Sequence, residues 1–362
     1  MTKLILNLFF IICSVTYGCQ SNSDQTMEGE VEVEAEPIPD VPFNGTLKVL
    51  TLNTWHEGVS VTGGFNAIVE VIIQSKADVV VLVEIRNYNN VTFSHKIKDE
   101  LKSRNETFYT FNSGKSAIIL SKFPMTSSPN LDTPALSKSI VKLNETTSVA
   151  VYGAHLDYTH YACYLPRGYD GITWKKLPSP ITDVSKILEQ NKASQRDEAI
   201  AVFVEDAEKE RQNGNLVLLG GDFNEPSHLD WTIATKDLFD HNGTVVPWHN
   251  SLTLKNKNYL DAYRVKYPDP VTHPGHTWAA HNTRVELSKL VWTPTADDRD
   301  RIDFIYYNKD TRLTLDDVIV VGPKGSIVRG QGVQETSQDE FLLSQIFWPS
   351  DHKGVLATFK IN

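Results

Sequence analysis

The sequence contains very little cysteine. Only three of its 362 residues are cysteine, and two of them, Cys13 and Cys19, lie within the first 20 residues. Cys163 is therefore the one thiol of the remaining chain, and a single thiol can form neither an internal disulfide nor a thiolate metal cluster. This excludes a disulfide-stabilised scaffold and a cysteine zinc site, and we predict no functional role for Cys163.

The sequence also lacks an excess of basic residues. It has 35 Lys and Arg residues against 45 Asp and Glu residues, which gives a formal net charge of -10. Residues 1–42 contain seven of the acidic residues and one lysine, so the rest of the chain is only mildly acidic. A nuclease that follows a polymer backbone is expected to have a basic stripe. Nucleic acid is therefore an alternative partner that the composition does not favour.

Long hydrophobic runs are scarce, and the one that stands out lies near the N-terminus. Residues 4–15 are mostly apolar and follow a short basic start, but they are too few to span a bilayer comfortably. Such a segment is typical of an export signal. It ends in Thr-Tyr-Gly-Cys19, which resembles the lipobox of bacterial lipoproteins, where the signal is cut before a cysteine that then receives lipid.

We therefore predict that residues 1–19 are an export signal and that Cys19 is lipidated. The acyl chains would hold the protein at a membrane, periplasmic or on the cell surface, without spanning it. A soluble secreted protein is the alternative if Cys19 is not lipidated. Residues 20–44 are acidic and contain Pro37, Pro39 and Pro42, a composition that favours a tether. Residues 45–362 are predicted to form one catalytic domain, and we expect a monomer.

From residue 45 onward, apolar strands alternate with segments that have helical spacing. Continuous apolar runs are typical of strands covered on both faces, which predicts an α/β layered protein. We expect strands at residues 47–52, 78–83, 148–154, 216–221, 302–307 and 355–359, and helices at residues 65–74 and 193–211.

Polar residues follow four of these predicted strands directly. One polar residue after a buried strand usually marks only the point where the chain meets water. Strand ends on one side of a sheet converge, however, and open α/β folds place their sites there. Carboxylates and an amide suit a hard divalent cation, and imidazoles suit proton transfer. The candidate residues are Asn53, Glu84, His155 and Asp222, together with Asp303, Asp351 and His352 from two later segments.

These residues stand in short motifs whose order resembles the endonuclease/exonuclease/phosphatase superfamily, which has a DNase I-like fold. The motifs are Leu-Asn-Thr-Trp at Asn53, Val-Glu at Glu84, Gly-Ala-His-Leu-Asp at His155, Gly-Gly-Asp-Phe-Asn at Asp222, Arg-Ile-Asp-Phe-Ile at Asp303 and Ser-Asp-His at Asp351. The resemblance covers about residues 45 to 361. It implies a four-layered α/β sandwich, in which two packed mixed β-sheets are flanked by helices.

The resemblance also implies metal-dependent hydrolysis of a phosphoester by in-line attack of water. Asn53 and Glu84 would hold Mg²⁺, with Asp351 in or beside its coordination shell and Mn²⁺ as an alternative ion. Asp222 would orient or deprotonate the water, and Asn224 would donate a hydrogen bond to the phosphoryl oxygens. His352, held by Asp303, would stabilise the developing charge, and His155 would lie near the leaving group.

Each residue also has a purely structural interpretation. Asn224 could close a turn before Pro226, Asp303 could pair with Arg301 or Arg299 on the surface, and His352 could be a buried structural imidazole. The ordered set of motifs favours the functional interpretation, because unrelated structural residues would not all fall in this arrangement.

The substrate is less well specified by the sequence. Residues 158–185 form a long connection rich in aromatic residues, and such connections often border a site. We predict that Tyr158, Arg167 and Trp278 contact the substrate. Three functions remain open: a phosphohydrolase acting on a small or terminal phosphoester, a secreted nuclease, and a catalytically inactive surface-binding lipoprotein. We favour the first, because a binding protein has no need for the complete set of candidate ligands.

Overall fold

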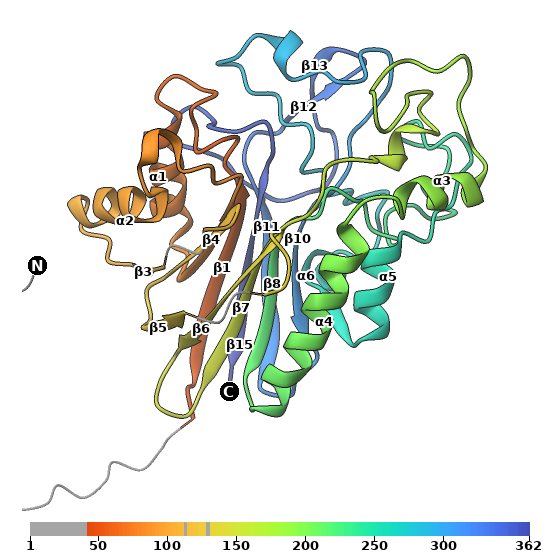
Figure 1. Cartoon of the computed structure of the whole chain (residues 1–362). Helices are drawn as coiled ribbons and strands as arrows, with labels where there is room; N and C mark the ends of the chain where they lie inside the picture. The colour runs from red at the N-terminus through yellow and green to blue at the C-terminus, as the bar shows by residue number, and fades with distance from the viewer. Residues whose placement is uncertain (1–41, 112–113, 128–130) are drawn as a thin grey trace, which may run out of the picture. The chain divides into compact units, whose positions relative to one another are not determined.

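Two mixed β-sheets packed face to face form the centre of the protein (Figure 1). This computed structural model describes residues 42–111, 114–127 and 131–362. The predicted signal, most of the predicted tether and Cys19 lie outside the described residues. The first sheet has seven strands in the order β14-β11-β15-β1-β2-β4-β3, and the second has six in the order β5-β6-β7-β8-β10-β9.

The strands of the first sheet are β1 (Gly45–Asn53), β2 (Val79–Val83), β3 (Tyr109–Thr110), β4 (Ala117–Ser121), β11 (Leu313–Val321), β14 (Phe341–Leu342) and β15 (Gly354–Ile361). Those of the second sheet are β5 (Met125–Ser127), β6 (Leu136–Lys142), β7 (Ser148–His155), β8 (Leu216–Asp222), β9 (Tyr259–Asp261) and β10 (Asp303–Asn308). A separate hairpin consists of β12 (Gly325–Val328) and β13 (Gln331–Gln334).

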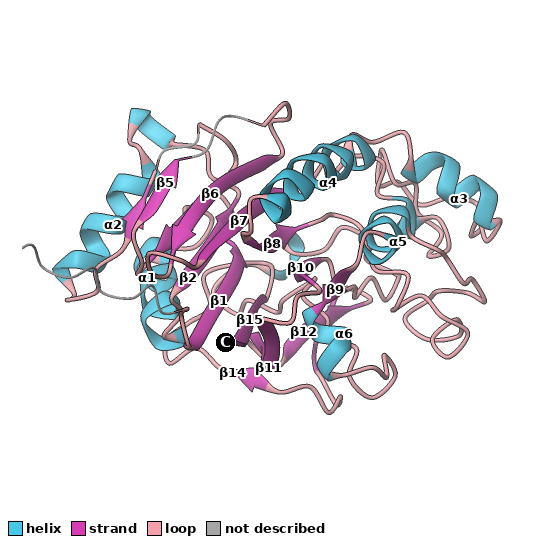
Figure 2. Ribbon diagram, turned by 90° about the horizontal axis from the view of Figure 1, so that it is seen from below, coloured by secondary structure: helices cyan, strands magenta, loops and turns pink. Residues whose placement is uncertain are grey.

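Helices cover the outer faces of both sheets, so the molecule has four layers (Figure 2). Helices α1 (Gly64–Ser75) and α2 (Phe93–Ser103) pack on the first sheet, and α4 (Arg196–Gln212) and α5 (His249–Asn256) pack on the second. Helices α3 (Val184–Asn191) and α6 (Ala262–Lys266) complete the set, with 3₁₀ turns at Tyr88–Asn90, Ala162–Tyr164 and Leu287–Lys289. The predicted four-layered sandwich is confirmed.

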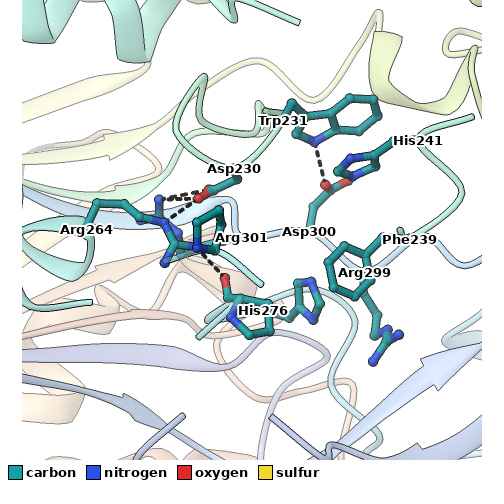
Figure 3. Close-up of a pocket in the computed structure, with 11 residues that line it drawn as sticks. Asp230, Trp231, Phe239, His241, Arg264, His276, Arg299, Asp300 and Arg301 are labelled. Carbon is teal, nitrogen blue, oxygen red and sulfur yellow. Dashed lines mark hydrogen bonds and ion pairs between the residues drawn. The ribbon is translucent and has the colours of Figure 1, made fainter. Parts of the chain in front are cut away.

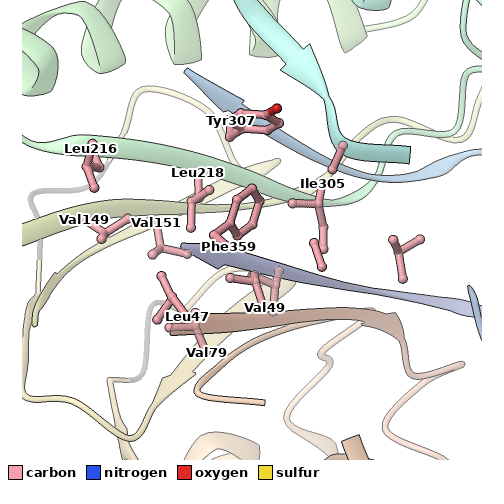
Figure 4. Packing of buried hydrophobic residues seen from close by; sticks show 14 of the residues in the cluster. Leu47, Val49, Val79, Val149, Val151, Leu216, Leu218, Ile305, Tyr307 and Phe359 are labelled. Atoms are coloured by element: carbon pink, nitrogen blue, oxygen red, sulfur yellow. The ribbon is translucent and has the colours of Figure 1, made fainter. Parts of the chain in front are cut away.

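The apolar runs of the strands supply both faces of each sheet, because successive side chains point to opposite sides. In β2, Val79 and Val81 enter the core between the sheets, whereas Val80 and Leu82 pack under α1 and α2. The central core joins residues of both sheets (Figure 4), including Leu47, Val49, Val149, Val151, Leu216, Leu218, Ile305 and Phe359. Continuous apolar strands in the sequence thus correspond to sheets covered on both faces.

The strand pairing places the two ends of the folded chain side by side. β1 and β15 run antiparallel, and Gly45 pairs with Ile361. β15 lies between β1 and β11 near the middle of the seven-stranded sheet. Within the described part of the chain, no helix combines the length and the apolar character needed to cross a membrane.

Candidate active site

The polar residues predicted at strand ends gather at one end of the sandwich. β7, β8 and β10 are neighbours, and their register pairs His155 with Asp222 and Asp222 with Asp303. β1 ends at Asn53, whose side-chain amide donates to Glu84 Oε1 at 3.1 Å and to Asp222 Oδ2 at 3.0 Å. Asn53 therefore links the two sheets directly. Beside these residues lies a cavity of about 350 Å³.

His352 stands between two carboxylates. Its Nδ1 atom lies 3.0 Å from Asp303 Oδ2, and its Nε2 atom lies 3.8 Å from Asp222 Oδ2. Burial lowers the pKa of His352, but the charges of Asp303 and Asp222 outweigh burial, so the pKa lies well above its usual range. The imidazole is therefore positively charged at neutral pH, with one nitrogen held by Asp303.

Asp222 is held in a fixed orientation beside this ring. The backbone amide of Asn224 donates to Asp222 Oδ1 at 2.8 Å, and the Asn53 amide donates to the other oxygen. Burial raises the pKa of Asp222 to about 7, although His352 acts in the opposite direction. A carboxylate with this pKa can accept a proton near neutral pH.

Glu84 and Asp351 supply further carboxylates to the cavity. Glu84 has a left-handed backbone, with φ 64°, directly after β2. Burial raises the pKa of Asp351 to about 7, and the charge of Glu84 acts in the same direction. Within the described ranges, neither carboxylate forms an ion pair with Lys or Arg. Asp351 is buried, whereas Glu84 is half-buried and lies 3.3 Å from His56 Nε2. Two carboxylates at one cavity without a Lys or Arg partner among the described residues fit a hard divalent cation.

A second group of metal-type ligands is formed by Asp222, Asp303 and His352, whose ligand atoms lie within 4.8 Å of one another. The His352 contacts described above explain this closeness, because a protonated imidazole donates to Asp303 through Nδ1 and attracts the Asp222 carboxylate on its other side. A metal ion there would have to replace a ring proton. The group could accept a metal, but Glu84 and Asp351 offer the oxygen ligands that Mg²⁺ prefers.

His155 has a different environment from His352. Its Nδ1 atom lies 2.6 Å from Ser116 Oγ, and its Nε2 atom lies 4.0 Å from Glu84 Oε1. Burial lowers the pKa of His155 to about 4, and Glu84 offsets this only in part. The ring is therefore neutral at pH 7, lines the cavity and can exchange hydrogen bonds there.

Asn224 lines the cavity and also makes local contacts. Its backbone is left-handed, with φ 48°, a conformation that asparagine adopts more readily than most residues. Its side-chain amide donates to the carbonyl oxygen of Leu156 at 3.0 Å and lies 3.4 Å from Asp222 Oδ2. Asn224 thus closes the turn after β8 at the edge of the cavity.

The structure places two of the three predicted substrate residues at the cavity. Tyr158 and Trp278 line it, and the Trp278 ring lies 4.9 Å from the His352 ring. Arg167 does not line it. Its side chain is fully buried, forms an ion pair with Asp300 and donates to the carbonyl oxygen of Arg299. The prediction that Arg167 contacts the substrate is therefore corrected, because Asp300 neutralises this guanidinium inside the protein.

Figure 3 shows the surroundings of Asp300, where Trp231 Nε1 donates to the same carboxylate. Arg301 and Arg264 both pair with Asp230 nearby, and Arg301 also pairs with Asp261. Arg301 is therefore not a partner of Asp303. The crevice lined by these groups has a volume of only about 10 Å³, close to the space of a single water molecule, so it is no substrate site.

Several residues of the cavity were not predicted. Ser116 contacts His155, and Thr277 Oγ1 accepts hydrogen bonds from the backbone amides of Ile302 and Asp303. These partners lie far apart in sequence, and no local pattern marks them. The aromatic residues around residue 174 could have been predicted from the sequence, since they belong to the aromatic-rich connection that was expected to border the site. The additional lining residues are Trp55, His56, Arg86, Tyr161, Tyr164, Trp174, Trp292 and Ile302.

The two-sheet sandwich thus gathers carboxylates, amides and imidazoles at one end. The chain belongs to the endonuclease/exonuclease/phosphatase family, whose sequence pattern matches residues 50–352. The family is dependent on divalent metal ions, and the motif order predicted this membership.

Three proteins that are similar to this chain in sequence or in structure have different degrees of sequence identity to it. The uncharacterized protein F14F9.5 of Caenorhabditis elegans is 26% identical over 323 residues, which are 86% of this chain and 91% of that protein. An endonuclease/exonuclease/phosphatase structure from Beutenbergia cavernae is 16% identical, with a TM-score of 0.47, and covers 88% of this chain and 72% of its own. Truncated TDP2 of C. elegans is 18% identical, with a TM-score of 0.46. The match covers 87% of this chain and 97% of the TDP2 chain.

Proposed function

We propose that the protein is a Mg²⁺-dependent phosphoesterase that hydrolyses a small or terminal phosphoester outside the cytoplasm. The observation that carries this proposal is the position of His352 between Asp303 and Asp222 at a cavity that also contains Glu84 and Asp351. A charged imidazole and a carboxylate with a pKa near 7 thereby share a site with two further carboxylates.

Glu84, Asn53 and Asp351 would hold the metal ion, with Mn²⁺ able to replace Mg²⁺. The two carboxylates have no Lys or Arg partner among the described residues, and the amide of Asn53 already contacts Glu84. When bound, the cation would supply Lewis-acid neutralisation of the phosphoryl charge. The side chains of the protein would provide the other catalytic functions, which are holding the water, accepting its proton and stabilising the developing charge.

Asp222 holds the attacking water and takes its proton. Asn53 and the Asn224 backbone amide fix the carboxylate, so its free lone pairs face a defined direction. His352 donates from Nε2 to a phosphoryl oxygen, while Asp303 keeps the ring charged and oriented through Nδ1. Preorganised donors of this kind stabilise charge that develops in the transition state without reorganising.

His155 and Asn224 act at the edge of the reacting group. Ser116 orients the neutral His155 ring, which leaves Nε2 toward Glu84 and the cavity to hydrogen-bond the leaving oxygen. Asn224 would turn its amide from Leu156 toward a phosphoryl oxygen when substrate binds.

Cavity size and charge support a small substrate over a polymer. The volume of about 350 Å³ lies at the lower end of small-molecule sites. Arg86 is the one Lys or Arg residue among those that line it. A nuclease that followed a phosphate backbone would need several cations in a row.

The proposal also covers the cellular location and the oligomeric state of the protein. The apolar start of the sequence and the motif ending at Cys19 support export, with lipid on Cys19 as the membrane anchor. Secretion without an anchor is the alternative if Cys19 is not modified. We propose that the protein acts as a monomer.

The test measures turnover of bis(p-nitrophenyl) phosphate, p-nitrophenyl phosphate and plasmid DNA by the full-length protein, with EDTA or with Mg²⁺. His352→Ala and Asp222→Ala should abolish Mg²⁺-dependent turnover. Matched controls are His249→Ala and Asp237→Ala, since both side chains form exposed ion pairs on the surface.

Each result has a defined meaning. Turnover of a chromogenic ester that needs Mg²⁺ and both residues supports the proposal. Preferential cleavage of plasmid DNA would replace it with the nuclease function. A well-folded protein that cleaves none of the three substrates would contradict catalysis on esters of this size and favour a binding protein.

A further inference from the structure

Three aromatic rings form one side of the cavity, and we call them the aromatic wall: Tyr158, Trp174 and Trp292. The ring centroids of Trp174 and Trp292 lie 4.6 Å apart, and those of Trp174 and Tyr158 lie 6.2 Å apart. Tyr158 is 56% exposed and Trp292 is 43% exposed. Trp174 and Trp292 meet edge to face at 65°, and Tyr158 is tilted by 44° to Trp174. Large rings that stay exposed at the mouth of a site offer apolar surface to a ligand.

Hydrogen bonds fix the backbone that carries two rings of the aromatic wall, those of Tyr158 and Trp174. Tyr158 lies between Asp157 and Thr159, whose carbonyl oxygens both accept hydrogen bonds from the buried guanidinium of Arg196 on α4. The backbone amide of Trp174 donates to the carbonyl oxygen of Asp170 at 2.9 Å. Contacts of this kind reduce the entropy that binding would otherwise cost.

Arg86 adds one cation to the same cavity. Its backbone amide donates to Glu57 Oε1 at 2.7 Å, and the next amide donates to the same oxygen. Glu57 itself is buried, so this turn is anchored to the protein. Within the part of the chain that the structure describes, the Arg86 guanidinium has no ion pair and no hydrogen bond. It is therefore free to receive an anion.

We propose that the substrate carries a planar ring, of the nucleoside or aryl kind, that stacks on the aromatic wall while Arg86 binds one of its anionic oxygens. This inference rests on the proposed phosphoesterase function and names the class of organic group on the phosphoester. The aromatic wall and Arg86 together fit an anion joined to a ring.

The test measures equilibrium binding rather than turnover. Uridine 5′-monophosphate and ribose 5-phosphate are titrated calorimetrically into the full-length protein in the presence of EDTA, so that neither ligand is hydrolysed. They share a sugar phosphate and differ in the base. The wild type should bind the nucleotide about tenfold more tightly, the size of effect expected for one stacked base.

Variants assign the difference to particular residues. Trp292→Ala should remove most of the preference for the nucleotide and leave ribose 5-phosphate binding unchanged. Trp174→Phe should retain the preference, because phenylalanine keeps a ring face. Arg86→Ala should weaken both ligands by a similar factor. Tyr109→Ala, at an exposed tyrosine on β3, serves as the control and should change neither.

Equal binding of the two ligands by the wild type would overturn the inference, as would a preference that survives in Trp292→Ala combined with Tyr158→Ala. These outcomes are separate from the phosphoesterase function. If the protein hydrolyses esters but shows no preference for the nucleotide, only the stacking inference is refuted. If it prefers the nucleotide but hydrolyses no ester, only the proposed phosphoesterase function is refuted.

Discussion

At the scale of single residues, the two imidazoles of the site differ because their partners differ. His352 contacts two carboxylates and is charged, whereas His155 contacts a hydroxyl and is neutral. Both side chains are largely shielded from water, with 12% of His155 and 6% of His352 exposed, so burial alone cannot explain the difference. The nearest charges decide it, as expected where water is excluded.

Asp303→Asn should lower activity by about a hundredfold or more, a loss typical when a charged donor is weakened in the transition state. Removing the Asp303 charge lowers the pKa of His352, so the ring loses its proton as pH rises. The defect should therefore be smaller at pH 6 than at pH 9. The measurement is kcat/KM against pH for both proteins.

Asp310→Asn is the control, since Asp310 forms an ion pair with Arg312 away from the cavity. It should have the wild-type pH profile. A loss in Asp303→Asn that is the same at every pH would mean that Asp303 orients His352 without setting its charge.

At the scale of elements, the close pairing of β7 and β8 depends on Gly221. Its φ of 144° is rarely adopted by other residues, and a Cβ atom there would lie 1.9 Å from the carbonyl oxygen of Ala154. The two strands carry His155 and Asp222 at their ends. Their separation therefore controls how closely these side chains approach.

Gly221→Ala should lower the free energy of unfolding by about 3 kcal/mol, because neither backbone can move aside without breaking the ladder. Gly220→Ala is a matched control, since a Cβ there would meet its neighbours at 3.6 Å or more. It should change stability by less than about 1 kcal/mol. Chemical denaturation of both variants gives the comparison, and equal losses would contradict the steric explanation.

Much of this arrangement could be predicted from the order of residues. Strand ends at Asn53, His155 and Asp222 were predicted within one residue, because strands buried on both faces stay apolar until they reach the site. The contacts between distant segments could not be predicted in this way. Ser116 and His155 are 39 residues apart, and Arg167 and Asp300 are 133 residues apart.

The correction at Arg167 has a physical reason. An arginine in a loop next to a site is expected to face the substrate unless a buried acid binds it first. Asp300 is such an acid, and nothing in its local sequence connects it with Arg167, whereas the Arg-Ile-Asp-Phe-Ile motif marks Asp303 three residues later. The sheet register brings Asp303 rather than Asp300 to the site, because Asp303 lies within β10 opposite Asp222.

At the scale of the whole molecule, a bound cation should stabilise the fold. Glu84, Asp222 and Asp351 bring three carboxylates to one cavity. A ligand that binds only the native state adds about 2.7 kcal/mol at a hundred times its dissociation constant. Adding Mg²⁺ after EDTA treatment should therefore raise Tm by several degrees.

The same Mg²⁺ titration of Glu84→Gln should show a much smaller increase in Tm. The comparison uses the increase within each protein, because removing a carboxylate also changes the stability of the metal-free form. An undiminished increase in Glu84→Gln would place the metal ion elsewhere.

Buried His241 should make global stability depend on pH. It is stacked on Trp231, with ring centroids 3.6 Å apart (Figure 3), and burial lowers its pKa to about 2. In the unfolded chain its pKa is about 6.5. Below pH 6.5 the imidazole of His241 gains a proton in the unfolded chain but not in the native protein. The contribution of neutral His241 to the free energy of unfolding is therefore complete above pH 6.5 and falls as pH decreases.

His241→Phe should keep the stack and remove this pH dependence. Between pH 7 and pH 5, the wild type should lose about 2 kcal/mol more of its unfolding free energy than the variant. Denaturation curves at the two pH values provide the test. Parallel losses in both proteins would show that His241 is protonated in the native state.

The central position of β15 has a consequence for the order in which the protein is made. Asp351 and His352 precede β15, and this last strand must enter between β1 and β11. A growing chain on the ribosome therefore carries Asn53 and Glu84 long before their partners exist. A chain that stops before Asp351 and His352 therefore lacks part of the candidate site and should be inactive.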